Sequence, residues 1–322
     1  MDLAASIQEL SEDITVRYVT HWIEKTGLHN VGVAGGVFAN VLINQKVYEI
    51  DGVDSVFPYP AMSDEGIAGG AALVRFHEKA AKGESKPAKA FDTVYLGPSF
   101  SEEEIAAALD AKDVEYTRPE NLEQEVARLL SENYVVARFA GKMEYGPRAL
   151  GNRSILYRPD DPSVNDWLNQ RLNRTEFMPF APATIMENAE RCYPHVAGVK
   201  DAARFMTVTQ DCSEEMKRSC GGVVHVDGTA RPQLVLEQDN PGYYKIIQEF
   251  EKLTGLPAIV NTSFNLHEEP IVCNPEDAVR GFLMGNLDVL AIGPFLAMNP
   301  KLVKPSEREH GAGKASPAVS AS

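Results

Sequence analysis

The chain has 322 residues, and its 31 Lys and Arg against 46 Asp and Glu give a formal net charge of −15. At about 150 residues per domain, this length predicts two domains. The acidic balance argues against a nucleic-acid partner, because contacts to phosphates need a surplus of basic residues. Hydrophobic residues make up 44% of the chain and charged residues 24%, as in ordinary globular proteins.

Membrane and secretion signals are not evident in the sequence. No apolar run approaches the ~20 residues of a membrane span, and the N-terminus carries no basic-then-apolar pattern. The four cysteines form no CxxC pair, so reduced thiols are expected. We therefore expect a cytoplasmic protein with no membrane partner.

The first 82 residues have the pattern of an α/β layer. Apolar residues recur every three or four positions from Leu3 to Trp22, which predicts a helix with one apolar face and Gly27 as its C-cap. At about 80 residues this segment resembles half a domain, so we expect the rest to come from another chain or to be lost. The expected elements are helices at residues 3–22, 36–44 and 64–82, a buried strand at 30–34 and a second strand at 54–57.

A polar, proline-containing stretch follows, and we place a linker at residues 83–92. A mixed α/β domain is expected over residues 93–305. Residues 306–322 are rich in Ser, Ala, Gly and Pro without periodicity, which predicts a disordered tail. The domain's expected helices lie at residues 101–110, 121–131, 243–253 and 276–284, and its expected strands at 134–139, 180–186, 203–209, 222–226, 257–260 and 288–292.

The densest cluster of candidate functional residues runs from Lys142 to Ser154, directly after a predicted strand. Two glycines and a proline define the loop backbone, and Lys142, Arg148 and Arg153 make it cationic. Arginine forks and loop N–H groups bind phosphate or carboxylate oxygens, so the segment predicts an anionic ligand. The alternative is a solvated loop paired with nearby acids.

Two weaker cationic segments follow. Arg171 and Arg174 precede an apolar, proline-punctuated strand, and surface arginines at a helix end explain them equally well. Residues 225–233 contain an Asp-Gly-Thr turn, beyond which Arg231 and Gln233 would project. An ordinary turn is the alternative there, and His225 is more simply a structural residue than an acid or base.

Polar side chains also follow a predicted strand. Asn261, Thr262, Ser263 and Asn265 come after the apolar strand at 257–260, where open α/β sheets place their ligands; local turn capping is the alternative.

In the first segment, Gly35-Gly36 would let a nucleotide approach the backbone closely, and Asp64 could be a helix cap or a metal ligand. The seven histidines form no HxxH or HxxxH pair, so no self-contained zinc or iron site of usual spacing is expected.

Taken in order, these segments resemble the NodU/CmcH carbamoyltransferase family, whose enzymes join a Kae-type ASKHA domain to a C-terminal YrdC-like domain. The resemblance covers residues 1 to about 305. It implies an α/β fold, with a partial ASKHA second lobe at residues 1–82 followed by a YrdC-like domain at 93–305. The strings that carry it are Gly35-Gly36-Val37-Phe38-Ala39-Asn40, Asp64-Glu65-Gly66, Met143 through Ser154, Phe180-Ala181-Pro182, Asp227 through Arg231 and Asn261-Thr262-Ser263-Phe264-Asn265.

The resemblance implies a two-stage reaction. Carbamoyl phosphate yields carbamate, which attacks the α-phosphate of ATP to give carbamoyl-adenylate and pyrophosphate; a metal site then helps to transfer the carbamoyl group to a hydroxyl of a small acceptor. On this basis the catalytic residues are expected to be Lys142, Arg148, Arg153 and Arg231. The residues expected to bind substrate or nucleotide are Gly35, Gly36, Asn40, Asn152, Ser154, Arg171, Thr229, Asn261, Thr262, Ser263 and Asn265.

The cofactor expected from the family is ATP with Mg²⁺. Asp64 matches a family metal ligand, for iron or another divalent metal, but the family's His-x-x-x-His pair lies on the first lobe, to which nothing here corresponds. A partner chain that supplies this lobe is therefore expected. The alternative is a catalytically incomplete fragment that binds nucleotide or a partner protein. RNA modification is a third possibility, by analogy with the threonylcarbamoyl enzymes of similar fold, but the net charge of −15 argues against tRNA binding.

Overall fold

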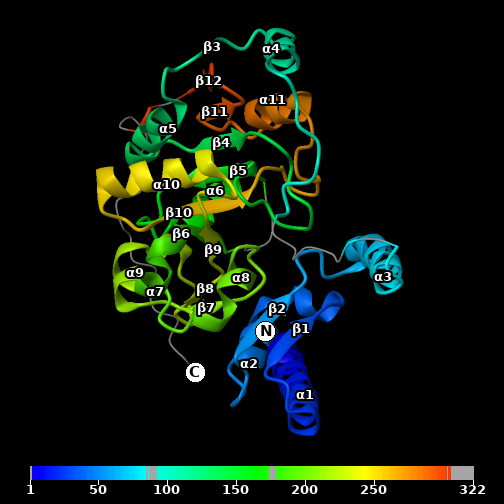
Figure 1. The fold of residues 1–322 in the computed structure, drawn as a ribbon. Helices are drawn as coiled ribbons and strands as arrows, with labels where there is room; N and C mark the ends of the chain where they lie inside the picture. The colour runs from blue at the N-terminus through cyan, green and yellow to red at the C-terminus, as the bar shows by residue number, and fades with distance from the viewer. Residues whose placement is uncertain (1, 85, 87–92, 174–178, 303, 306–322) are drawn as a thin grey trace.

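The computed structural model describes residues 2–84, 86, 93–173, 179–302 and 304–305 (Figure 1). The expected linker at 83–92 and tail at 306–322 lie largely or wholly outside these residues. An N-terminal unit precedes a larger unit built on one mixed sheet. The elements of the N-terminal unit are α1 (Asp2–Thr26), β1 (Asn30–Val33), η1 (Gly36–Ala39), α2 (Val41–Tyr48), β2 (Ser55–Pro58), η2 (Asp64–Gly66) and α3 (Ile67–Ala81).

The larger unit follows the expected mixed α/β class. Its helices are α4 (Glu102–Asp110), α5 (Leu122–Ser131), α6 (Val164–Arg171), α7 (Ala189–Cys192), α8 (Lys200–Ala203), α9 (Glu214–Ser219), α10 (Pro241–Thr254) and α11 (Pro275–Met284), with 3₁₀ turns η3 (Met186–Asn188), η4 (Ala197–Val199) and η5 (Gly221–Val223). Its strands are β3 (Tyr116–Thr117), β4 (Val136–Phe139), β5 (Arg153–Tyr157), β6 (Ala181–Ile185), β7 (Gln210–Asp211), β8 (Thr229–Ala230), β9 (Gln233–Val235), β10 (Ala258–Ser263), β11 (Val289–Ile292) and β12 (Phe295–Met298).

In the N-terminal unit, β1 and β2 form a parallel pair in which Asn30 lies opposite Ser55 and Val33 opposite Pro58. The sequence predicted a buried strand here, and this is wrong: β1 alternates between exposed and half-buried residues. The helix expected at 36–44 is also divided. A 3₁₀ turn ends at Ala39, and α2 then begins because the Oδ1 atom of Asn40 accepts the N–H groups of Leu42 and Ile43.

Eight strands form the main sheet, in the order β3-β12-β11-β4-β5-β10-β6-β9. β11 is parallel to β4 and β9 is parallel to β6, whereas β5 is antiparallel to both β4 and β10, and β10 is antiparallel to β6. As a result, β4, β10 and β11 end at the same edge of the sheet where β5, β6 and β9 begin. We call this edge the loop edge, because the loop of residues 140–152 connects β4 to β5 there.

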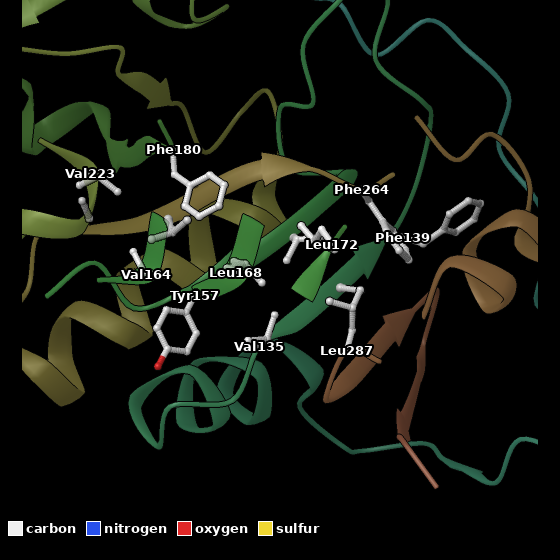
Figure 2. Close-up of a cluster of buried hydrophobic side chains, with 14 of the residues drawn as sticks. Val135, Phe139, Tyr157, Val164, Leu168, Leu172, Phe180, Val223, Phe264 and Leu287 are labelled. Carbon is white, nitrogen blue, oxygen red and sulfur yellow. The ribbon is translucent and has the colours of Figure 1, made fainter. Parts of the chain in front are cut away.

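Helices cover both faces of this sheet (Figure 1). α5 and α10 pack together on one face, where Val126 and Phe250 share a buried cluster with Val136. The neighbouring Ala137 belongs to the cluster on the opposite face, because successive strand residues point to opposite sides. There, Leu168 and Phe282 pack with the side chains around Phe139, Tyr157 and Phe264 that Figure 2 shows.

The two units are joined by hydrogen bonds between α2 and the segment around α8. The Nδ2 atom of Asn44 donates to the carbonyl oxygen of Thr207 at 2.7 Å, and the N–H of Thr209 donates to that of Val41 at 3.3 Å. The hydroxyl of Tyr48 accepts the N–H of Gly198 at 3.0 Å. The N-terminal unit therefore contacts the larger unit through hydrogen bonds between side-chain and main-chain groups of α2 and main-chain groups of the larger unit.

Two predicted strands of the larger unit are wrong. Residues 203–209 continue from α8 into a turn, with Met206 at a φ of +56°, and residues 222–226 begin in η5. Neither run pairs in the main sheet: residues 203–209 are largely buried, whereas residues 222–226 run from the buried Val223 to the exposed Val226. A short apolar run cannot be assigned from periodicity alone. The strands β3, β5, β7, β8, β9 and β12 and the helices α6, α7, α8 and α9 were not predicted; β5 was missed because the motif containing Arg153 was taken as a loop. The expected helices at 101–110, 121–131, 243–253 and 276–284 and the strands at 134–139, 180–186, 257–260 and 288–292 are confirmed.

Candidate functional site

The loop of residues 140–152 is organised around one carboxylate. The Oε1 atom of Glu144 accepts the backbone N–H groups of Leu150 at 2.7 Å, Asn152 at 2.8 Å and Arg153 at 3.2 Å. Glu144 is buried, so these charge-assisted bonds are made away from water. They turn the second half of the loop back on the first.

A second set of contacts supports the loop from the α10 side. The Nη1 atom of Arg138 donates to the carbonyl oxygen of Gly151 at 2.6 Å and to the Oδ1 atom of Asn152 at 2.8 Å. Asn240, the N-cap of α10, donates to the same Oδ1 atom at 2.9 Å. The Nδ2 atom of Asn152 donates to the carbonyl oxygen of Lys142 at 2.8 Å. Asn152 therefore connects both ends of the loop.

Arg153 is fully buried and surrounded by carbonyl groups. Its Nη1 atom donates to the carbonyl oxygens of Ala140 at 2.8 Å and Asn152 at 3.0 Å, and its Nη2 atom donates to that of Pro98 at 3.3 Å. Its guanidinium lies 3.7 Å from the centre of the Phe139 ring, and burial lowers its pKa to about 10. These contacts favour a role in holding the loop, whereas the sequence suggested a ligand contact.

Arg148 and Arg231 have different surroundings. The Nε atom of each is buried and has no hydrogen-bond partner among the residues that the structure describes, and neither side chain forms an ion pair with them. Burial lowers the pKa of Arg148, and burial together with the nearby Arg148 lowers the pKa of Arg231 to about 9. Two cations without a counter-charge thus lie close together at the loop edge. The side chain of Lys142 is exposed.

Polar residues of the neighbouring strands reach the same edge. The Nδ2 atom of Asn261, on β10, donates to the carbonyl oxygen of Ala149 at 3.1 Å and to the Oε1 atom of Gln233 at 2.7 Å. Ser263 lies opposite Ser154 in the pairing of β10 with β5, and its hydroxyl donates to the Oδ1 atom of Asn265 at 2.5 Å. Thr262, between Asn261 and Ser263, is half-buried. The sequence predicted that these three residues follow the strand, and this is wrong, because they are the last three residues of β10.

The turn before Arg231 is tied together internally. The Oδ1 atom of Asp227 accepts the N–H of Thr229 at 3.0 Å and its hydroxyl at 2.8 Å. The Nδ1 atom of His225 lies 3.1 Å from the Thr229 hydroxyl oxygen. Burial lowers the pKa of His225, and the charge of Arg231 lowers it further, against the opposing effect of Asp227. Thr229 is thus engaged by its own turn.

Arg171 lies at the other end of the sheet. It pairs with Asp288 at 2.5 Å, and the carboxylate of Asp288 is 1% exposed. Asp288 immediately precedes β11, which is parallel to β4, so this pair is at the edge opposite the loop edge. The structure therefore does not bring Arg171 together with the other predicted site residues. Arg174 lies outside the described residues.

The predicted residues of the N-terminal unit gather at a second place. Gly35, Gly36 and Asp64 line a cavity of about 430 Å³ beyond the carboxyl ends of β1 and β2. The N–H of Gly35 donates to the carbonyl oxygen of Met62 at 2.7 Å, which joins the two turns. Asn40 does not line this cavity: it caps α2 and binds the Gln8 side chain through its Nδ2 atom at 2.6 Å.

Asp64 is the predicted metal ligand, and it is exposed at the start of η2. Among the residues that the structure describes, no three His, Cys, Asp or Glu side chains come together in a way that could hold a metal ion. Asp64 could therefore contribute to a metal site only with ligands from outside the described part of the chain.

The cavity and the 140–152 loop are in contact. The hydroxyl of Tyr145 donates to the carbonyl oxygen of Glu65 at 3.2 Å, and the rings of Tyr145 and Tyr59 lie 6.5 Å apart, edge to face. A Cβ atom on Gly146 would lie 3.0 Å from the carbonyl oxygen of Pro60. The segment that carries Arg148 therefore packs against the turn that carries Asp64.

Three residues that organise this site were not singled out from the sequence: Arg138, Glu144 and Asn240. Glu144 lies inside a segment that was noticed for its arginines. Arg138 could have been singled out from the sequence, because it lies within an otherwise apolar strand. An arginine there is expected to be buried, and a buried cation needs hydrogen-bond acceptors nearby.

Comparison with known proteins identifies the family. Residues 127–299, more than half of the chain, match the family described as "Carbamoyltransferase C-terminus", and residues 1–73 match "Carbamoyltransferase N-terminus". This chain belongs to the carbamoyltransferase family. The expected resemblance to the NodU/CmcH proteins is confirmed.

Relatives of this carbamoyltransferase chain include nodulation proteins. It is 36% identical over 299 residues to nodulation protein NolNO of Sinorhizobium fredii, covering 92% of this chain and 43% of that protein. It is 36% identical to nodulation protein NolO of Bradyrhizobium diazoefficiens, covering 92% and 54%, and 31% identical to nodulation protein U of Rhizobium tropici, covering 83% and 44%. The chain thus spans about half the length of these relatives.

The solved structure of full-length HypF in its phosphate- and nucleotide-bound form aligns with 56% of this carbamoyltransferase chain at 18% identity, covering 22% of HypF, with a TM-score of 0.37. Of the helices that the structure describes, none combines the length and the apolar character needed to cross a bilayer.

Proposed function

We propose that this chain contains the adenylate-forming site of an O-carbamoyltransferase, at the loop edge of its main sheet. Carbamoyl phosphate would bind there, and a water molecule would cleave its bond between the carbamoyl group and the phosphate to give carbamate and inorganic phosphate. The carbamate oxygen would then attack the α-phosphate of ATP, breaking the bond to the β-phosphate and releasing pyrophosphate. The product, carbamoyl-adenylate, would finally give its carbamoyl group to a hydroxyl of a small-molecule acceptor and release AMP.

One observation supports this proposal above the others: Arg148 and Arg231 are desolvated side by side with no counter-charge among the described residues. Such an arrangement is unfavourable in the free protein and becomes favourable when an anion arrives. Phosphate oxygens are suited to arginine forks. In a chain with a net charge of −15, this local reversal of sign favours a phosphorylated substrate.

The remaining predicted residues take supporting roles in this proposal. Lys142, exposed at the start of the loop, would meet the polyphosphate of ATP, with which Mg²⁺ would enter. Arg153 and Asn152 would fix the loop that presents Arg148, and Ser154, Ser263 and Asn265 would provide polar groups at the ends of β5 and β10. Neither Arg171 nor Thr229 has contacts that favour a role in ligand binding.

The transfer step is proposed for the N-terminal unit, in the cavity lined by Gly35, Gly36 and Asp64. Its turn contacts the arginine loop through Tyr145 and Glu65, which would keep the two sites adjacent. Because the described residues hold no metal site, we assign no step to a metal.

We also propose that a further α/β lobe, supplied by a partner chain, covers α1. Leu3, Ile7, Leu10, Ile14, Tyr18 and Trp22 form one stripe along this helix, and each is between 41% and 76% exposed. Exposed apolar patches of this kind mark interaction surfaces. The parallel pair β1–β2 supports the same idea, because parallel sheets are normally covered on both faces.

The second candidate function is a nucleotide-binding or partner-binding subunit without catalytic activity of its own. The exposed stripe of α1 is the observation that favours it. It predicts binding of ATP or of a partner without turnover.

Release of pyrophosphate from ATP and Mg²⁺, with and without carbamoyl phosphate, separates the two candidates. For an adenylate-forming enzyme we expect release that requires carbamoyl phosphate and falls at least about 100-fold in Arg231→Met, the size of effect seen when one donor to developing charge is removed. Arg118→Met is the matched control, because Arg118 is an exposed arginine paired with Glu102, and it should retain full activity. Folded protein that releases no pyrophosphate would favour the binding subunit.

A further inference from the structure

We propose that the Oδ1 atom of Asn261 accepts a hydrogen bond from the amide group of the carbamoyl moiety, and thereby selects carbamoyl phosphate over phosphates that lack this group. The inference rests on the proposed function and names the group that would give the site its substrate preference.

The orientation of the Asn261 amide is fixed by the main-chain carbonyl groups of Ala149 and Leu150. The Nε2 atom of Gln233 donates to the carbonyl oxygen of Leu150 at 2.8 Å, so the Oε1 atom of Gln233 is free to accept. Asn261 donates from its Nδ2 atom to this Oε1 atom at 2.7 Å and to the carbonyl oxygen of Ala149 at 3.1 Å. Neither amide can be turned round without placing two oxygens together. The Oδ1 atom of Asn261 must therefore point away from both acceptors.

This Oδ1 atom is a buried acceptor in need of a donor. Asn261 is 2% exposed, and its Oδ1 atom has no hydrogen-bond partner among the described residues. A buried acceptor without a donor is unfavourable and calls for an explanation. A ligand that brings an N–H group would supply one.

The position of this acceptor links it to the arginine pair. Asn261 is bound to Ala149, the residue after Arg148, and to Gln233, two residues after Arg231. One neutral acceptor is thus held by the segments that carry Arg148 and Arg231, whose Nε atoms have no hydrogen-bond partner among the described residues. The complementary ligand is a small anion that also carries an N–H donor. Carbamoyl phosphate has this combination, because its phosphate is an anion and its amide nitrogen carries two hydrogens.

A purely structural role for Asn261 makes a different prediction. If its only task were to hold Ala149 through Nδ2, a change at Asn261 would weaken every phosphate ligand to the same extent. If Asn261 instead recognises the amide group, a change at Asn261 would alter the preference between ligands with and without this group. The ratio of two dissociation constants is therefore the informative quantity.

The test uses two stable, isosteric ligands of the full chain, measured by isothermal titration calorimetry. Phosphonoacetamide carries the amide, and acetonylphosphonate replaces its NH₂ by CH₃. We expect the wild-type chain to bind phosphonoacetamide at least about tenfold more tightly, because the methyl ligand leaves the acceptor unsatisfied. Equal affinities would overturn the inference. This ratio needs no variant, so it decides even if a substitution prevents folding.

Two variants then locate the effect. In Asn261→Ala the ratio should fall to about one, because the acceptor is gone. Gln233→Ala is the matched control: it breaks the same anchor of the loop but leaves the Oδ1 atom in place, so both ligands should weaken while their ratio stays near the wild-type value. A ratio that is unchanged in Asn261→Ala would contradict the proposal.

The same titrations keep this inference separate from the proposed function. If both analogues bind equally and inorganic phosphate displaces them, the anion site stands and only the role of Asn261 is rejected. If the folded chain binds neither analogue and no inorganic phosphate, the proposed function fails together with the inference.

Discussion

The Oε1 atom of Glu144 accepts the backbone N–H of Asn152 at 2.8 Å, eight residues further along the chain. The same oxygen accepts the N–H groups of Leu150 and Arg153. A single buried atom thus closes the loop that carries Arg148. Its loss would leave three buried donors to find other partners.

We therefore expect Glu144→Ala to lower the free energy of unfolding by about 2–4 kcal/mol, because each buried donor without an acceptor is costly. Glu144→Gln retains an acceptor oxygen, and it should lose roughly half as much or less. Urea unfolding followed by circular dichroism measures both. A Glu144→Ala protein as stable as the wild type would show that the loop does not depend on this carboxylate.

Half of the strands of the main sheet were predicted, namely β4, β6, β10 and β11, because these segments and the helices that cover them have clear patterns. The strand at 134–139 is apolar apart from Arg138, and α5 and α10 have apolar residues at helical spacing. β5 was missed because its first residue, Arg153, was assigned to the charged motif before it. Nothing in the local sequence indicates that a guanidinium will be buried against Phe139 and a set of carbonyl groups.

The segments that form the candidate site could be predicted from the sequence, but the contacts that each residue makes within it could not. The motif strings placed Arg148, Arg231 and Asn261 among the candidates, and the pairing of the strands brings their segments to one edge. Arg148 and Arg153 look alike in the sequence, yet among the described residues Arg153 donates to carbonyl groups, whereas the Nε atom of Arg148 has no partner. This difference depends on long-range contacts that spacing does not encode.

Arg231 and Arg153 should respond in opposite ways to the same substitution. Arg231→Met removes a desolvated cation beside Arg148, so the free energy of unfolding should stay constant or rise by up to about 2 kcal/mol. Arg153→Met takes donors away from buried carbonyl groups, and a loss of about 2–4 kcal/mol is expected. Urea unfolding of the ligand-free proteins measures the difference, and equal losses in both variants would refute the distinction.

Gly151 is required by both its backbone and its surroundings. Its φ is +112°, and a Cβ atom would lie 2.4 Å from the Cδ1 atom of Tyr243. We expect Gly151→Ala to destabilise the protein by about 2–4 kcal/mol, from backbone strain and overpacking together. Gly255→Ala is the control: its φ is +76° but nothing lies within 4 Å of the added atom, so a loss of about 1 kcal/mol is expected. Similar thermal unfolding midpoints for the two variants would contradict this argument.

His225 should make the protein sensitive to acid. Burial lowers its pKa in the folded state below the ordinary value of 6.5, so below that pH the unfolded state binds more protons than the folded state. The free energy of unfolding must then fall as the pH falls through this range. In His225→Asn this contribution is absent. Urea unfolding between pH 7.5 and 5.0 should therefore show the wild type losing more stability than the variant, and the reverse order would mean that the pKa is raised.

The apolar stripe of α1 should be dispensable for folding but not for association. Ile7 and Ile14 are 57% and 51% exposed, so the double substitution Ile7→Glu and Ile14→Glu should change the free energy of unfolding by no more than about 0.5 kcal/mol. It should also reduce binding of the dye ANS and any self-association seen by light scattering, because the apolar surface is interrupted. Val19 is on the same helix but is 8% exposed and packs in the main cluster. Val19→Glu should therefore cost about 3 kcal/mol or more. If the double variant were equally destabilised, the stripe would be covered within the folded chain, and the proposed docking of a further lobe there would be wrong.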